Sequence, residues 1–255
     1  MRLIVPDVEA ARALARTWAE GASAVTEWGT APLYEAERRL RAGLADLAFV
    51  PALAVLRDPD AFSVVPGVGL VGGAGVPARL AVFSALDRIR RVGFDPHFAQ
   101  EALLAQVLLK ELYDAQPVFV PLGGGAVPAD PSAGSGQALD AELRVGGDAP
   151  EAGYVMDLAH EWFELTTRPF VWALLAAPVG TVEPHEAQRL RDAALELDPE
   201  RMPGTDPAVG GVTLAAYAHA GLEDWVKHLF YHRALDDMPA IPFVELPEED
   251  DEGGE

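Results

Sequence analysis

The first fifty residues alternate short apolar runs with amphipathic helical repeats, and this alternation constrains the fold more than any other feature. Apolar runs at residues 3–5, 23–28 and 47–50 predict strands. Between them, residues 8–19 and the segment from Thr30 to Gly43 carry apolar side chains at helical spacing. Strand, helix and strand at this spacing predict βαβ units, whose strands lie parallel in one sheet.

A second strand–helix pattern follows further along the chain. Residues 91–94 predict a strand, and a helix from Pro96 to about Tyr113 follows directly. Two apolar strands, Leu80–Ser84 and Phe170–Leu174, bracket this pattern. We therefore predict an α/β chain of two lobes, each with a mixed, mostly parallel sheet. The predicted boundaries place residues 1–83 and 174–255 in lobe 1 and residues 84–173 in lobe 2.

The charge balance limits the classes of partner. The chain has 19 basic and 40 acidic residues, a net charge of −21, which disfavours binding to nucleic acid and to anionic membranes. Residues 245–255 hold seven acidic side chains and no basic one, so residues 246–255 are expected to form a disordered acidic tail. A small molecule is the expected partner, and a homodimer stays open.

The cysteine content and the lengths of the apolar runs indicate in which cellular compartment the protein is expected. The chain has no cysteine, so disulfides, thiolate nucleophiles and zinc–thiolate sites are excluded. No apolar run reaches the roughly 18 residues that a membrane span needs. The start, Met1 to Asp7, is too short and too soon interrupted by Pro6 to be a signal peptide. A cytoplasmic location is therefore expected.

The segment Asp157–Ala173 carries the most distinctive motif, Asp-Leu-Ala-His-Glu-Trp-Phe-Glu-Leu-Thr-Thr-Arg-Pro-Phe-Val-Trp-Ala. It resembles a hallmark of the chorismate dehydratases of the futalosine route to menaquinone. The segments Leu40–Pro51, Arg79–Ser84 and Gly147–Ala149 resemble further motifs of that family, in the same order. The resemblance implies a two-lobed fold like that of type II periplasmic binding proteins. It also implies a lyase that dehydrates chorismate to 3-enolpyruvylbenzoate without a cofactor.

The resemblance also implies a set of site residues. Ser84 is the implied catalytic residue. The implied substrate contacts are Pro51, Ala52, Asp95, His97, Asp148, Thr166 and Phe170. Arg168 is a further predicted contact, at a place where the family normally has no cation.

Three of these regions depart from the family pattern. Ala52 stands where the family has a serine, and His97 to Gln100 replace a run of serine and threonine residues. The segment Pro6–Glu9 stands where the family has Tyr-Leu-Asn. A non-catalytic protein that binds a small anion or an aromatic ligand on the same scaffold is therefore the alternative function.

Physical chemistry adds two anion-binding elements. The helix that begins after Asp95 and Pro96 presents a positive partial charge at its N-terminus, which favours anions. Arg168 could grip a carboxylate with two parallel hydrogen bonds. Pairing of Arg168 with Glu161 or Glu164 on the preceding helix is the structural alternative.

Two histidines raise the question of a metal. His228 and His232 lie four residues apart in a predicted helix. The sequence offers no third ligand at a fixed spacing and no glutamate between them as in a zincin. No metal site is therefore predicted.

Overall fold

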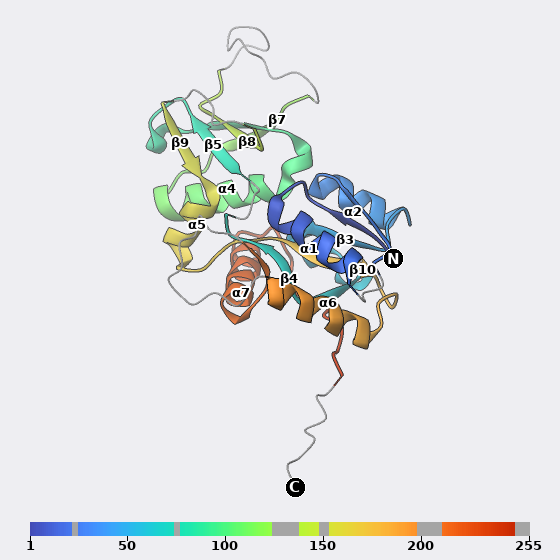
Figure 1. The fold of residues 1–255 in the computed structure, drawn as a ribbon. Helices are drawn as coiled ribbons and strands as arrows, with labels where there is room; N and C mark the ends of the chain where they lie inside the picture. The colour runs from blue at the N-terminus through green and yellow to red at the C-terminus, as the bar shows by residue number, and fades with distance from the viewer. Residues whose placement is uncertain (22–24, 74–76, 124–137, 148–152, 198–210, 248–255) are drawn as a thin grey trace.

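The computed structural model describes residues 1–21, 25–73, 77–123, 138–147, 153–197 and 211–247. These residues form two α/β lobes, each built on its own sheet (Figure 1). The predicted two-lobed fold of the type II periplasmic-binding-protein class is confirmed. The predicted tail falls largely on residues 248–255, outside the described residues.

The first lobe is built on a six-stranded sheet of order β11-β4-β10-β3-β1-β2. Strand β1 pairs parallel with β2 and β3, as the N-terminal βαβ pattern predicts. Strand β10 runs antiparallel to both β3 and β4, and β11 runs antiparallel to β4. The strand bounds are Arg2–Val5 for β1, Glu27–Thr30 for β2, Leu47–Pro51 for β3, Phe62–Val71 for β4, Val171–Pro178 for β10 and Gly211–Thr213 for β11.

The second lobe is built on a five-stranded sheet of order β7-β6-β8-β5-β9. Strand β6 pairs parallel with β7 and β8, whereas β5 runs antiparallel to β8 and β9. In each sheet four strands therefore run in one direction, as expected for a mixed, mostly parallel sheet, whereas β10, β11 and β5 run against them. The bounds are Ala78–Val82 for β5, Arg91–Phe94 for β6, Val118–Pro121 for β7, Ala141–Val145 for β8 and Tyr154–Asp157 for β9.

The helices bury the faces that the sequence periodicity predicts. In α1, Ala11, Leu14, Ala15 and Trp18 are buried, and the Trp18 indole donates to the Leu190 carbonyl of α6 at 3.2 Å. None of the helices in the described segments is long and apolar enough to cross a membrane. The helix bounds are Glu9–Glu20 for α1, Leu33–Arg41 for α2, Ala52–Arg57 for α3, Ala99–Tyr113 for α4, Leu158–Thr166 for α5, Pro184–Leu197 for α6 and Ala216–Tyr231 for α7.

The chain crosses between the lobes earlier than predicted. Strand β5 lies in the second sheet between β8 and β9, so the first crossing falls between Val71 and Ala78, not after residue 83. The second crossing falls between Thr166 and Val171, because β10 belongs to the first sheet from its first residue. An apolar strand looks the same in either sheet, so sequence alone could not assign these two strands.

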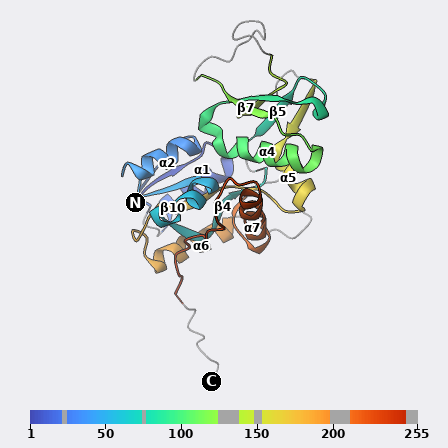
Figure 2. The same cartoon turned by 180° about the vertical axis from the view of Figure 1, so that it is seen from behind.

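An aromatic cluster fills the junction where the second crossing enters the first lobe. The rings of Trp162, Phe170, Trp172 and Trp225 meet edge to face, with centroids 4.6–5.7 Å apart. All four side chains are fully buried. Trp162 lies on α5 of lobe 2, Phe170 lies in the crossing segment, and Trp172 and Trp225 lie on β10 and α7 of lobe 1, so the cluster joins the lobes. Figures 1 and 2 show α4 and α5 on the side of lobe 2 that faces α7.

Gly221 allows α7 to approach the second crossing closely. A Cβ at this position would overlap the Pro169 carbonyl oxygen and lie 3.4 Å from its carbon. Helix α7 continues through Gly221 from Ala216 to Tyr231, so this glycine serves close packing and does not divide the helix.

We expect Gly221→Ala to destabilise the protein by about 1–3 kcal/mol, because the backbone atoms that meet the new methyl group cannot rotate away. Gly29→Ala is the control, since its Cβ would meet only the Ile4 side chain at 3.9 Å. Denaturant unfolding of both variants measures the difference. Equal stability of the two variants would contradict the close approach.

Candidate functional site

A cavity of about 530 Å³ lies between the two lobes. Its lobe 1 wall follows the carboxyl ends of the parallel strands: Pro6–Val8 after β1, Pro32–Tyr34 at the start of α2, and Pro51 at the end of β3. In open α/β sheets this edge is the usual place for ligands. The lobe 2 wall consists of His97–Glu101 at the start of α4, together with Pro77, Val145 and Gly146.

Helix α4 begins at the cavity because of its capping residue. The Asp95 carboxylate accepts the His97 backbone N–H at 3.0 Å, which caps the short 3₁₀ turn Pro96–Phe98 that leads into α4. The predicted cap and the predicted helix end at Tyr113 are confirmed. The positive end of the α4 dipole therefore lies at the cavity wall.

Gln100 fixes this helix start against the other lobe. Its side-chain oxygen accepts the Leu53 backbone N–H of α3 at 2.8 Å, and its NH₂ group donates to the Trp172 carbonyl of β10 at 2.8 Å. The side chain is 3% exposed. One buried amide thus connects α4 of lobe 2 with two elements of lobe 1.

The charged groups of the cavity differ in how far they are already paired. Arg41 donates to Glu37 at 2.9 Å and to Asp58 at 2.8 Å, and its guanidinium lies over the Phe62 ring. Arg57 also lines the cavity, but among the described residues it has no hydrogen-bond or ion-pair partner. Arg57 is therefore the cation with free donors for an incoming anion.

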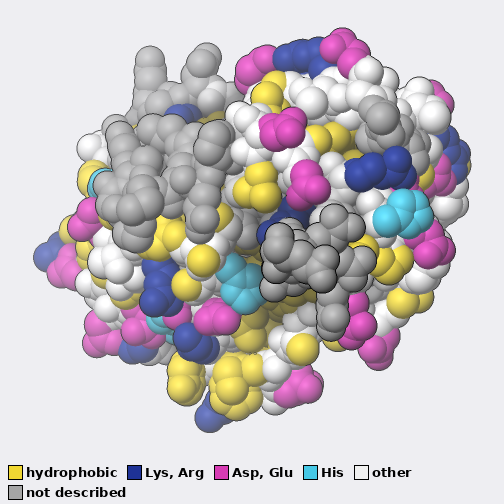
Figure 3. All heavy atoms as spheres, turned by 60° about the horizontal axis from the view of Figure 1, so that its bottom comes forward, with side chains coloured by type: hydrophobic (Ala, Val, Ile, Leu, Met, Phe, Trp, Pro, Cys, Tyr) yellow, Lys and Arg dark blue, Asp and Glu magenta, His cyan; other side chains and the backbone are white. Residues whose placement is uncertain are grey.

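The acidic character of the chain makes one unpaired cation in the cavity important for attracting an anionic ligand. Basic and acidic side chains are interspersed on the face that Figure 3 shows. The whole chain carries a net charge of −21. A small anion must therefore be held by local groups, because the general field of the protein repels it.

Glu101 adds a titratable group to the cavity wall. Its side chain lies in the first turn of α4 and is 6% exposed. Burial raises its pKa from the usual 4.5 to about 7, because the low-dielectric surroundings disfavour the charged form. The protonated and ionised forms of this carboxyl group are thus both accessible near neutral pH.

Aromatic rings from the two lobes are in contact with one another at the cavity wall. The Tyr34 ring of lobe 1 lies 4.5 Å from the His97 ring of lobe 2 and 6.0 Å from the Phe98 ring. His97 Nδ1 lies 2.8 Å from the Asp95 carboxylate, which orients the imidazole. All three rings line the cavity, so a flat ligand would find aromatic surface there.

Comparison with known proteins decides the family. The family model described as menaquinone biosynthesis matches residues 31–196, well over half of the chain. The chain belongs to this family. Among curated proteins, none matches the sequence.

Two solved structures show the same fold as this menaquinone biosynthesis family member. Protein AF1704 from Archaeoglobus fulgidus is similar with a TM-score of 0.60 and 17% identity, over 92% of this chain and 98% of that one. A protein from Parabacteroides distasonis described as an ABC transporter has a TM-score of 0.55 and 13% identity, over 98% and 99% of the two chains.

The structure brings some of the predicted site residues of this family member to the cavity. Pro51 and His97 line it, Ala52 is buried directly behind Pro51, and Asp95 holds the His97 imidazole. Asp148 lies outside the described residues.

Other predicted residues lie away from the cavity lining. The Ser84 hydroxyl donates to the neighbouring Ala85 carbonyl at 3.3 Å. Ser84 follows the last residue of β5, whereas the cavity residue Pro77 precedes the first residue of this strand. The Thr166 hydroxyl donates to the Trp162 carbonyl at 2.9 Å within the last turn of α5. Phe170 is 0% exposed and belongs to the aromatic cluster. These three positions serve local structure, and a substrate contact by any of them stays a prediction.

Arg168 has a partner that the sequence could not indicate. Its guanidinium donates to the Asp224 carboxylate of α7 at 2.6 Å. The predicted alternative partners, Glu161 and Glu164, are wrong, because the close approach at Gly221 brings α7 beside this segment. Arg168 is not among the residues that line the cavity.

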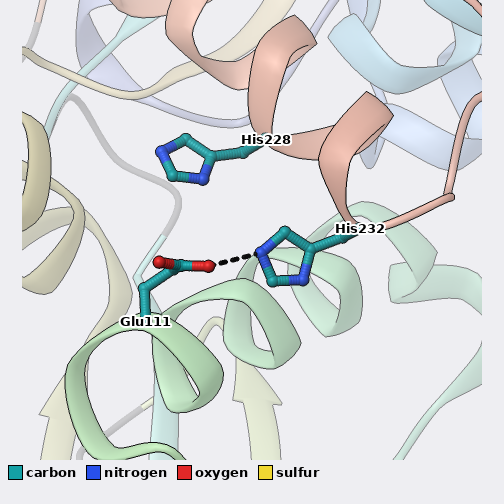
Figure 4. A group of neighbouring side chains, drawn as sticks. All are labelled: Glu111, His228 and His232. Atoms are coloured by element: carbon teal, nitrogen blue, oxygen red, sulfur yellow. Dashed lines mark hydrogen bonds and ion pairs between the residues drawn. The ribbon is translucent and has the colours of Figure 1, made fainter.

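A second cluster of ligating groups lies outside the cavity. Glu111 of α4 lies beside His228 and His232 of α7, and their ligand atoms are all within 4.8 Å of one another (Figure 4). The third group that the sequence did not offer therefore comes from the other lobe, more than a hundred residues away.

We expect Glu101→Gln to become more stable relative to the wild type as the pH rises. Between pH 4.5 and 7 the unfolded carboxyl group ionises while the folded one stays protonated. The wild type therefore loses up to about 3 kcal/mol of unfolding free energy across this window, and the variant does not.

Denaturant unfolding at pH 4.5, 6 and 8 measures this difference between wild type and variant. Glu164→Gln, which removes an exposed carboxylate on α5, is the control. Parallel stability profiles of wild type and Glu101→Gln would contradict a raised pKa.

Proposed function

We propose that this member of the menaquinone biosynthesis family is a carbon–oxygen lyase that dehydrates chorismate to 3-enolpyruvylbenzoate. The observation that carries the proposal is the cavity between the lobes, which combines the unpaired Arg57, the N-terminus of α4 and the buried carboxyl group of Glu101. Each of these groups has a separate task in such a reaction.

Binding would use the cationic groups. Chorismate carries two carboxylates, and Arg57 offers one of them a planar pair of donors. The positive end of α4 favours the other carboxylate. The two groups lie on opposite lobes, so a substrate that contacts both would hold the lobes together around it. The rings of Tyr34, His97 and Phe98 provide an apolar surface for the substrate ring.

The chemistry requires one group that can accept and return a proton. In the dehydration a ring carbon loses a proton, the neighbouring hydroxyl group leaves, and the ring becomes aromatic. Ionised Glu101 would accept the ring proton and then transfer it to the departing hydroxyl group, which leaves as water. Glu101 is ionised again at the end of this cycle. A pKa of about 7 suits both steps near neutral pH.

The reaction is redox-neutral, since only the elements of water leave the substrate. It therefore requires no redox cofactor, in line with the expectation from the sequence. A role in biosynthesis also agrees with the expected cytoplasmic location and with a small anion as the partner.

The direct test is incubation of the purified protein with chorismate. We expect chorismate to disappear and an aromatic product lighter by one water to form, followed by absorbance and mass spectrometry. Recovery of unchanged chorismate, with binding seen by calorimetry, would replace the lyase by a non-catalytic binding protein. Absence of both turnover and binding would overturn the assignment of chorismate.

We expect Arg57→Ala to weaken the binding of chorismate by about tenfold or more, or about 1.4 kcal/mol, because one carboxylate loses its charged partner. The melting temperature should not change, since Arg57 has no partner among the described residues. Calorimetric titration and thermal unfolding measure the two effects.

Two further variants serve as controls for the Arg57 experiment. Arg168→Ala should lower the melting temperature by breaking the pair with Asp224 and should leave binding unchanged. Ser84→Ala tests the catalytic role that the resemblance implies for Ser84, and wild-type turnover in this variant would exclude that role. A loss of binding in Arg168→Ala but not in Arg57→Ala would move the carboxylate contact to the second crossing.

A further inference from the structure

The cluster of Glu111, His228 and His232 has no task in the cavity. Glu111 lies ten residues beyond Glu101 on α4, which places it about 15 Å further along the helix axis. The cluster therefore lies at the opposite end of α4 from the proposed reaction, where α4 of lobe 2 faces α7 of lobe 1 (Figure 4).

The two histidines share one face of α7. They are four residues apart, so successive turns of the helix place them side by side, with ring centroids 6.2 Å apart. The buried Trp162 ring and the His228 imidazole pack edge to face, with ring centroids 5.4 Å apart, and this contact restricts rotation of the imidazole. In Figure 4 one nitrogen of the His228 ring faces the space between His232 and Glu111.

Glu111 completes the set from the other lobe. Its carboxylate lies 2.8 Å from His232 Nε2, and the ligand atoms of all three residues lie within 4.8 Å of one another. Among the described residues no hydrogen-bond partner is found for the His228 ring, so its nitrogen is available to a ligand. The Glu111–His232 pair alone does not account for the position of His228.

These ligand types and distances suit a divalent transition metal. Two imidazoles and one carboxylate form the His₂Glu set that binds Zn²⁺, with a water in the fourth position. Bonds of about 2.0–2.2 Å place ligand atoms roughly 3.5 Å apart around a tetrahedral ion. Rotations of the Glu111 side chain, which is 40% exposed, and of the His232 imidazole would bring the three ligand atoms, which now lie within 4.8 Å of one another, to that spacing.

We propose that Glu111, His228 and His232 form a binding site for a divalent transition metal ion of the zinc class, which links the two lobes through α4 and α7. The ion replaces the single hydrogen bond between Glu111 and His232 by three metal–ligand bonds. The bound ion carries two positive charges against one carboxylate, so it also offsets part of the net charge of −21 of the chain. The site is independent of the reaction proposed for the cavity.

The test uses the full-length, tag-free protein after chelator treatment and dialysis. Titration with Co²⁺, a spectroscopic substitute for Zn²⁺, should give visible absorption bands of a tetrahedral site that saturate at one ion per chain. Zn²⁺ should displace the Co²⁺ and raise the melting temperature of the wild type, because it binds only the folded state. Absence of both the bands and the thermal shift would overturn the proposal.

Variants identify the ligands. Glu111→Gln, His228→Ala and His232→Ala should each weaken Zn²⁺ binding by about tenfold or more. His219→Ala is the matched control, because His219 lies on the same helix but faces Glu223 at 3.5 Å, outside the cluster. If His228→Ala binds Zn²⁺ with the affinity of the wild type, His228 is not a ligand and the cluster is only a Glu111–His232 pair. If a variant does not fold, the wild-type Co²⁺ spectrum decides.

Discussion

The buried side chain of Gln100 is a polar link between the two lobes. Both of its hydrogen bonds cross from lobe 2 to lobe 1, one to the start of α3 and one to the central strand β10. A buried amide that lost either partner would leave an unsatisfied polar group, which costs about 1–3 kcal/mol. The start of α4, which lines the cavity, is therefore held in one position relative to α3 and β10.

The aromatic cluster supports the same junction by a different force. Hydrogen bonds fix direction, whereas the packed rings of Trp162, Phe170, Trp172 and Trp225 supply apolar burial and resist any change of volume. The close approach at Gly221 brings α7 onto this cluster and explains why Arg168 pairs with Asp224. The second crossing is thus a packed structural region, and the groups that we propose to bind the substrate lie on α3 and α4.

Local patterns predicted the local structure. The apolar stripe of α1, the cap at Asp95 and the parallel pairing of β1 with its neighbours all follow from rules that act over a few residues. The sheet to which β5 belongs depends on pairing with strands far along the chain, so the predicted lobe boundary was too late. Arg57 and Glu101 were not predicted as site residues for the same reason. The residues next to Arg57 and Glu101 in the sequence do not indicate that these two side chains, one from each lobe, line the same cavity.

The departures from the family pattern are connected through the start of α4. Where the resemblance implies a run of hydroxyl side chains, this chain has His97 to Gln100, followed by Glu101. Gln100 turns inward as the link between the lobes, and Glu101 is buried beside it on the cavity wall. The hydroxyl donors of the family pattern would only bind anions, whereas a carboxyl group with a pKa of about 7 can also move a proton. In the reaction that we propose, an ionised Glu101 would repel the anionic substrate. The unpaired Arg57 on the opposite lobe would then supply the attraction that a chain with a net charge of −21 otherwise lacks.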